Sequence, residues 1–307
     1  MKKIALFTGV LSLMTVLSAC NGDKDTNYSF DELKNSKIEH LHGLGYINGG
    51  PQVVISTHEG LYAHDKDGWK EANSEKHDYM GFQAVREGFF SSGHPEPGSK
   101  LENPLGLVKS TDRGASFEKL AFYGEIDFHY LAAGYESNAI YALNEMPTKE
   151  LPAGLQYSLD EGESWKEAPM NGFDSEFISN LAVHPSREEM IAIGSKDGLF
   201  LSEDYGENFA PFNEAGMVTF VTLTETGGLY ASFENDTVKL TSFVFDDKKE
   251  VEIQLLKNQE TNPIVFIAVN PDDQKEIVIA TFENDIYMTN DEGANWETLA
   301  ENGELLK

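Results

Sequence analysis

An octapeptide that recurs four times at a regular interval constrains the fold of this chain more than any other feature. Each copy reads Ser or Thr, any residue, Asp, any residue, Gly, two further residues and an aromatic residue. The copies begin at Ser110, Ser158, Ser202 and Thr289. The interval is about 45 residues between the first three copies and about twice that before the last, which is typical of repeat proteins whose unit is a small sheet.

The octapeptide has the composition of a tight turn between two antiparallel strands. Its aspartate can accept hydrogen bonds from the turn backbone, and its glycine can adopt the positive φ that such turns need. The aromatic residue then returns to the sheet. The sequence therefore predicts four hairpin turns, whose defining residues are Asp112, Gly114, Asp160, Gly162, Asp204, Gly206, Asp291 and Gly293.

These octapeptides resemble Asp boxes, also called BNR repeats, which occur in β-propeller proteins. The chain is similar to bacterial lipoproteins of the sialidase-like or glycosyl-hydrolase-like BNR-repeat type. The wider family includes sialidases, photosystem assembly factors and sortilin-type receptors. The resemblance implies a propeller over residues 37–307. It also implies that the aspartates of the turns are structural, because Asp boxes lie away from the sialidase active site.

Extending the period in both directions divides this region into six units. Short alternating strands with turn residues between them predict four antiparallel strands in each unit. The fifth unit lacks the octapeptide, and the second has a long insertion around Pro95–Pro104. The sequence thus predicts an all-β, six-bladed β-propeller with Asp-box hairpins, and two packed β-sandwich domains are the alternative. The units span about 37–74, 75–124, 125–173, 174–215, 216–259 and 260–307.

The N-terminal residues have the pattern of a lipoprotein signal peptide. Two lysines precede an apolar run, Ile4–Val16, that is too short for a permanent membrane span. Leu17–Cys20 resembles a bacterial lipobox. We therefore expect a signal peptide over residues 1–19, followed by a lipidated Cys20 and flexible tether over residues 20–36. An ordinary secretory peptide with an incidental cysteine is the alternative; the lipobox predicts an extracytoplasmic protein anchored to the membrane.

The charge balance limits the classes of partner. The chain has 52 acidic and 23 basic residues, which gives a net charge of −29. Such a surface repels phosphate backbones, so we expect no nucleic-acid partner. It attracts cations, although solubility alone also explains this acidity. Cys20 is the only cysteine, and the fold must therefore form without disulfides.

Histidines gather on one predicted face of the propeller. Each blade runs from inner to outer strand as A, B, C and D, so that the D–A connections and B–C turns surround one mouth of the central channel. His58 falls at a B–C turn, where a role in the turn itself is favoured. His64 and His184 fall on the opposite face of the propeller. The predicted site residues at the mouth are His40, His42, His77, Asp78, Met80, His94, Asp127 and His129.

Converging imidazoles predict a site for a metal ion or a polar ligand. Imidazole suits zinc, copper, iron and nickel, and a thioether such as Met80 would favour reduced copper, so copper or zinc is the expected metal. A small ligand or a protein partner at the channel mouth is also compatible with this pattern. Separate histidines that only bond to turns are the alternative.

Two other functions are also compatible with the sequence. A glycoside hydrolase of non-sialidase type needs two carboxylates that flank the scissile bond. The candidates on the channel-mouth face are Asp78, Asp127, Glu39, Glu59 and Glu96. A non-catalytic assembly or interaction scaffold needs neither metal nor small ligand. Sialidase activity is not expected, because it requires three convergent arginines. The only arginines, Arg86, Arg113 and Arg187, are predicted to lie on the opposite face.

Overall fold

The computed structural model describes residues 28–213, 216–256 and 261–307. These residues form strands, turns and irregular segments, and no helix occurs among them. The same ranges therefore hold no apolar helix of membrane-spanning length. The predicted signal peptide (1–19), the predicted lipidation site Cys20 and the tether up to residue 27 lie outside the described part of the chain.

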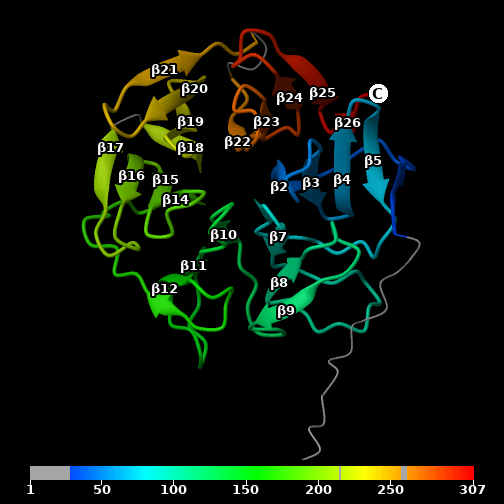
Figure 1. Ribbon diagram of the computed structural model, residues 1–307, viewed down its shortest axis with the longest axis horizontal. Coiled ribbons are helices and arrows are strands. Elements are labelled where there is room, and N and C mark those ends of the chain that lie inside the picture. Colours follow the sequence, from blue (N-terminus) through cyan, green and yellow to red (C-terminus); the bar gives the residue numbers. More distant parts are fainter. Residues whose placement is uncertain (1–27, 214–215, 257–260) are drawn as a thin grey trace, which may run out of the picture.

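Six antiparallel sheets stand around a central axis (Figure 1). Blade 1 contains β1 (Phe30–Glu32), β2 (Leu41–Tyr46), β3 (Val53–Thr57), β4 (Gly60–Asp65) and β5 (Gly68–Ala72), and blade 2 contains β6 (Gln83–Val85), β7 (Gly88–Ser91), β8 (Leu107–Ser110) and β9 (Glu118–Ala121). Blade 3 contains β10 (Tyr130–Ala133), β11 (Ile140–Asn144), β12 (Gly154–Ser158) and β13 (Lys166–Glu167), and blade 4 contains β14 (Ile178–Val183), β15 (Ile191–Ser195), β16 (Gly198–Ser202) and β17 (Ala210–Asn213). Blade 5 contains β18 (Met217–Leu223), β19 (Gly227–Glu234), β20 (Thr237–Val244) and β21 (Glu250–Ile253), and blade 6 contains β22 (Ile264–Val269), β23 (Ile277–Thr281), β24 (Ile286–Thr289), β25 (Glu297–Glu301) and β26 (Glu304–Leu305).

The prediction of an all-β, six-bladed propeller is confirmed, with one blade in each predicted unit. Strands β2, β6, β10, β14, β18 and β22 are the inner strands, and each lies beside the next around the axis. Blades 1 and 6 have five strands where four were predicted. The additional strand of blade 1, β1, pairs with β5 and lies within the segment 20–36 that we assigned to the tether. The folded part therefore begins before residue 37.

The ring closes through its two chain ends and not through a blade shared between them. Strand β26 extends blade 6 and pairs with the segment just before β2, by a bridge between Lys37 and Glu304. The backbone nitrogen of Ile38 donates to Gly303 O at 2.8 Å, and that of Leu305 donates to Ser36 O at 2.7 Å. Hydrogen bonds thus run without a break from blade 6 to the entry of blade 1.

The octapeptides form the C–D turns of four blades, which we call the repeat turns. In the first, Asp112 Oδ1 accepts hydrogen bonds from Ser116 N at 2.9 Å and from Ser110 Oγ at 3.0 Å. Ser110 Oγ in turn accepts from Gly114 N at 2.8 Å. Equivalent bonds recur around Asp160, Asp204 and Asp291. Each repeat turn therefore satisfies its polar groups within eight residues of chain.

The glycine of a repeat turn also packs one blade against the preceding one. Gly162 has a φ of 96°, and a Cβ atom there would lie 2.8 Å from Leu107 Cδ2 of blade 2. At Gly293 the same atom would lie 2.2 Å from Ile253 Cγ2 of blade 5. Only glycine combines this backbone conformation with so close an approach, so the repeat turns hold neighbouring blades together.

Candidate metal centre at the channel mouth

Three side chains from blades 1 and 2 meet where the channel opens, and we call His42, His58 and Asp78 the first cluster. His42 Nε2 lies 3.2 Å from His58 Nδ1 and 3.4 Å from Asp78 Oδ1, and His58 Nδ1 lies 2.8 Å from Asp78 Oδ2. One ligand atom from each residue lies within 4.8 Å of the other two, so the cluster could hold a metal ion. His40 lies at its margin, with its ring centroid 5.2 Å from that of His58.

A β-bulge directs His42 toward the channel. In β2, Leu41 pairs with Thr57 and Gly43 pairs with Ser56, so His42 is the extra residue. The inner strands of blades 4, 5 and 6 have a bulge at the same place, and in blade 5 the extra residue is Thr219, which donates to the next blade at Ile264 O. Bulges redirect side chains in this way and are common beside functional sites. In blade 1 the same geometry brings an imidazole to the neighbouring blade.

The first cluster is partly withdrawn from water. Burial lowers the pKa of His42 to about 4, although the negative charge of Asp78 opposes this shift. His42 is therefore neutral near pH 7, and a neutral imidazole has a lone pair available for a metal. Asp78 Oδ1 is buried and accepts no hydrogen bond from the described residues. An unsatisfied buried carboxylate oxygen is costly in a folded protein and is expected to have a partner.

Blades 2 and 3 contribute a second group at the same mouth, and we call His94, Asp127 and His129 the second cluster. Asp127 Oδ2 lies 3.2 Å from His94 Nε2 and 3.2 Å from His129 Nε2. The other ring nitrogens face outer partners: His94 Nδ1 lies 2.6 Å from Asn103 Oδ1, and His129 Nδ1 lies 3.5 Å from Glu145 Oε2. Asp127 Oδ1 resembles Asp78 Oδ1, since it is buried and lacks a hydrogen-bond partner among the described residues.

A backbone bridge connects the two clusters. Asp78 N donates to His94 O and His94 N donates to Asp78 O, both at 2.9 Å. Gly93 permits this contact: its φ is 108°, and a Cβ atom there would lie 2.0 Å from Asp78 O. The loop after β7, which contains the predicted site residue His94, thus packs against the connection that leads to β6.

Not every predicted site residue joins these clusters. His77 is buried apart from them: its Nδ1 accepts a hydrogen bond from Glu96 N at 3.0 Å, and its ring packs against Tyr79 and Phe117. The physical reason is strand alternation, because the neighbours His77 and Asp78 point to opposite sides of an extended chain. Met80 instead borders the central cavity.

The sequence pattern favoured a turn role for His58 and did not indicate Glu145. Both are B–C turn residues, like His94, and each reaches a group near the start of an inner strand. A signal was present in the pattern, since His58 and Asp78 correspond in adjacent blades to His94 and Asp127. The long insertion in blade 2 changes the spacing between the two pairs, which concealed this correspondence.

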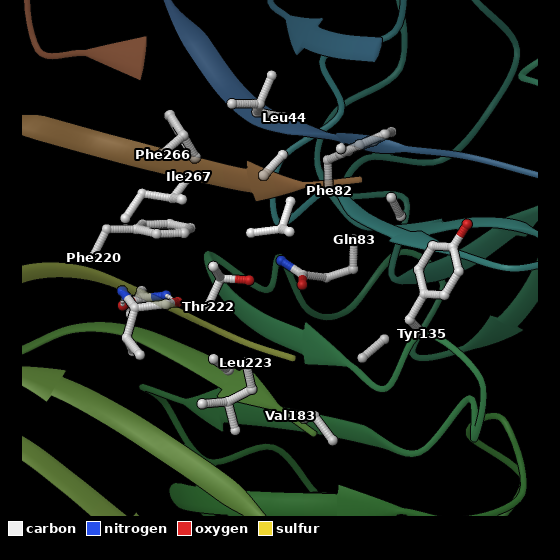
Figure 2. A pocket seen from close by; sticks show the side chains of 18 of the residues that line it. Leu44, Phe82, Gln83, Tyr135, Val183, Phe220, Thr222, Leu223, Phe266 and Ile267 are labelled. Carbon is white, nitrogen blue, oxygen red and sulfur yellow. Dashed lines mark hydrogen bonds between the residues drawn. The ribbon is translucent and has the colours of Figure 1, made fainter. Parts of the chain in front are cut away.

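A cavity of about 410 Å³ lies along the axis below the clusters and is lined by residues of all six blades. His42, Met80 and His129 border it near the beginnings of the inner strands. Farther along, much of the lining is apolar, and Figure 2 shows Leu44, Phe220 and Phe266 among the lining side chains, with Gln83 and Thr222 as polar groups. The channel therefore joins a polar mouth to an interior lined by both apolar and polar side chains.

The arginines do not assemble into a carboxylate-binding triad. Arg86 lies in an A–B turn on the face opposite the clusters, where it pairs with Glu136 and Asp272. Arg113 lies in a repeat turn and donates to Gln52, while Arg187 occupies another A–B turn. Arg86 and Arg113 belong to blade 2, whereas Arg187 belongs to blade 4 and pairs with Glu189.

Three large apolar side chains are exposed near the polar mouth. Met146 and Phe282 lie in the B–C turns of blades 3 and 6, and Phe177 lies in the connection that precedes β14. Phe282 is 75% exposed and Met146 is 77% exposed. They surround the channel on the same face as the clusters and supply apolar contact area there.

The fold and the site together define a six-bladed β-propeller with histidine–carboxylate clusters at one mouth of its channel. Similar solved structures include a GH74 xyloglucanase from Xanthomonas campestris, at 15% identity and a TM-score of 0.55, with 89% of this chain and 47% of that one covered. A GH74 enzyme from Niastella koreensis has 16% identity and a TM-score of 0.56 over 88% of this chain and 46% of that one. An oligogalacturonate lyase from Vibrio parahaemolyticus has 11% identity and a TM-score of 0.54 over 86% and 78%.

At these identities the likeness concerns the fold alone. The chain spans less than half the length of the two GH74 proteins that it resembles. No family model matches the chain, and no curated protein sequence matches it. The residues at the channel mouth therefore carry the functional information of this chain.

Proposed function

We propose that this protein is an extracytoplasmic, lipid-anchored β-propeller that binds a divalent transition-metal ion at the first cluster. The observation that carries the proposal is the convergence of His42, His58 and Asp78 around a carboxylate oxygen that is buried and unpartnered. Two imidazoles and a carboxylate are a common ligand set for zinc. A cation bound among them would supply the missing partner of Asp78 Oδ1.

The distances within the first cluster suit a tetrahedral metal. With metal–ligand bonds of about 2.0–2.1 Å, the ligand atoms of a tetrahedral site lie about 3.3 Å apart. His42 Nε2 lies 3.3 Å from His58 Nε2 and 3.4 Å from Asp78 Oδ1. Three protein ligands would leave a fourth position open toward the channel mouth for water or an exogenous ligand.

The donor set favours zinc or copper, and Zn²⁺ is the probe of choice. Imidazole and carboxylate ligands accept either metal, whereas the thioether of Met80, which borders the adjoining cavity, would favour reduced copper. Zn²⁺ has no redox chemistry, so its binding can be measured without control of oxidation state. Cu²⁺ then serves as a competitor in the same assay.

We expect the full chain, purified in detergent and stripped of metal by a chelator, to bind Zn²⁺ with micromolar or tighter affinity. Asp78→Asn keeps the side-chain volume but removes the charge, so affinity at the first cluster should fall by about 100-fold. His64→Ala is the matched control, because His64 packs on Trp69 away from the mouth. Elemental analysis after gel filtration and titration against a fluorescent chelator measure both variants. Unchanged Zn²⁺ binding in Asp78→Asn would refute the proposal.

The anchor rests on the residues before the propeller. An apolar run ends in Leu17–Cys20, and two acyl chains on Cys20 would hold the domain at the membrane stably. We expect the full chain to enter the detergent phase in phase partitioning, because of these chains. Cys20→Ala should move it to the aqueous phase, with Ser18→Ala as the matched control. A Cys20→Ala protein that still enters the detergent phase would contradict lipidation at this residue.

Assays on the same purified protein distinguish metal binding from two other functions. A glycoside hydrolase would turn over glycans without added metal and lose activity in Asp78→Asn, and the GH74 likeness alone does not support it beyond the fold. A scaffold is favoured by the exposed Met146, Phe177 and Phe282 around the mouth, since apolar side chains of this kind serve as anchors in protein interfaces. It would bind a protein partner equally well with and without metal.

A further inference from the structure

We infer that the axial cavity is a binding site for an aromatic carboxylate, whose carboxylate group takes the open coordination position of the ion at the first cluster. This inference rests on the proposed function, because that ion would hold one end of the ligand. His42 belongs to the first cluster and also lines the cavity, so the ion and the cavity adjoin. The cavity volume of about 410 Å³ lies in the range of small-molecule sites in proteins, about 300–1,000 Å³.

The charges around the cavity favour an anionic group at one place only. Among the described residues, no lysine or arginine lines the cavity. At the end opposite the clusters, Glu136 and Glu225 border the cavity, and Arg86 is already paired with Glu136. Asp78 and Asp127 lie at the mouth, so a carboxylate is repelled at either end unless a cation is bound. A divalent ion at the first cluster supplies that cation, and the carboxylate of the ligand therefore lies at the mouth.

The middle of the cavity suits the uncharged ring of such a ligand. Between the histidines at the mouth and the glutamates at the opposite end, the described lining residues include no charged side chain. Phe82, Phe220 and Phe266 are among the side chains that border this part (Figure 2). The ring centroids of Phe220 and Phe266 lie 5.6 Å apart at an angle of 58°. A further aromatic ring can pack against them in the offset or edge-on geometry that aromatic pairs prefer.

Two polar side chains in the cavity can bind a hydroxyl group on that ring. The amide of Gln83 in β6 and the hydroxyl of Thr222 in β18 point toward one another in Figure 2. Neither side chain forms a hydrogen bond with another residue in the described part of the chain. A hydroxyl between them could donate to one and accept from the other, which satisfies groups that the protein itself leaves unpaired.

The packing of blade 1 on blade 2 sets the depth of Gln83. A Cβ atom at Gly45 would lie 2.5 Å from Ala84 Cβ, so these two residues face each other and Gln83 is level with Leu44. Leu44 lies two residues beyond His42 in β2, which at about 3.3 Å per residue is up to about 7 Å along the strand. A cinnamate skeleton, with its carboxylate at one end and a ring hydroxyl at the other, is long enough to join these two levels.

The probe is para-hydroxycinnamate, which combines the carboxylate, the ring and the hydroxyl. The full chain, purified in detergent, is stripped of metal and titrated with the probe by calorimetry before and after it is loaded with Zn²⁺. We expect the Zn²⁺-loaded protein to bind the probe at least about tenfold more tightly, and saturating probe to raise the affinity for Zn²⁺ by the same factor, since such coupling is reciprocal. Asp78→Asn in the presence of Zn²⁺ should bind the probe only as the stripped protein does.

Two analogues and two variants locate the ends of the probe. The analogue para-hydroxycinnamyl alcohol lacks the carboxylate, so its binding should not depend on Zn²⁺. Cinnamate lacks the hydroxyl and should bind the Zn²⁺-loaded protein about tenfold more weakly than the probe. Gln83→Leu should remove this difference, and the fold should persist because no side-chain hydrogen bond is lost. Gln274→Leu is the matched control at the opposite end of the cavity and should keep the difference.

Binding of Zn²⁺ is measured first, so that the two proposals can fail separately. A chain that binds no Zn²⁺ overturns the proposed function and the inference with it. A chain that binds Zn²⁺ but not the probe, or that binds the probe equally well with and without Zn²⁺, overturns the inference alone. Equal affinities for cinnamate and the probe, or equal effects of Gln83→Leu and Gln274→Leu, also overturn the inference and leave the metal site standing.

Discussion

Replacing Gly93 by alanine is expected to displace both clusters at the channel mouth without changing any residue of either cluster. A Cβ atom at this position would lie 2.0 Å from Asp78 O and 2.7 Å from Met80 N, and the φ of 108° disfavours a side chain. The loop must move away, which breaks the two backbone bonds between Asp78 and His94. We expect a loss of about 3 kcal/mol in unfolding free energy, from backbone strain and overpacking together. Affinity for Zn²⁺ at the first cluster should also fall, because Asp78 loses the backbone bonds that hold it in place.

Gly98→Ala is the matched control for this experiment. Gly98 belongs to the same loop and has a φ of 92°, but nothing lies within 4 Å of a Cβ atom placed there. Its replacement should cost only the backbone strain, about 1 kcal/mol, and should leave Zn²⁺ binding unchanged. Equal effects of the two substitutions on Zn²⁺ binding would show that contact with Asp78 is not what orders the mouth.

Leu305→Ala is expected to open the seam of the ring. Leu305 in β26 is buried in a core cluster that includes Ile38 and Trp69 of blade 1 and Leu299 of blade 6. Loss of a buried leucine side chain costs about 3 kcal/mol. Because β26 is the strand that joins the two chain ends by hydrogen bonds, we expect the midpoint of chemical unfolding to fall and the chain ends to become accessible to protease.

Leu306→Ala provides the comparison for the seam. Leu306 is the next residue, has the same side chain and is only half-buried, so its replacement should cost about 1 kcal/mol. Urea unfolding monitored by tryptophan fluorescence is a suitable measurement, since Trp69 donates to Leu299 O across the seam at 2.9 Å. If the two substitutions destabilise the protein equally, the closure does not depend on burial of Leu305.

The ring itself could be predicted because its signals are local. Each repeat turn satisfies its aspartate, hydroxyl and glycine amide within one octapeptide, as Asp112, Ser110 and Gly114 do. Such contacts need no information from elsewhere in the chain. The closure was different: the pairing of β26 with the segment around Lys37 joins residues from opposite ends of the sequence, and neither segment has a pattern that indicates the other.

The order of strands within each blade predicts that histidines gather at the channel mouth. It does not predict which side chain each histidine contacts. Whether His42 points to the channel depends on a one-residue bulge, and His77 is excluded by the alternation of an extended chain. The contact between His58 and Asp78 crosses from one blade to the next.

The sequence by itself determined the blade, its turns and the number of repeats, because hydrogen bonds within an octapeptide and a period of strands are short-range properties. Only the tertiary structure decided which imidazole meets which carboxylate. These contacts depend on how adjacent sheets pack and on the pairing register of the strands. A register shift of one residue turns a side chain to the opposite face of the sheet.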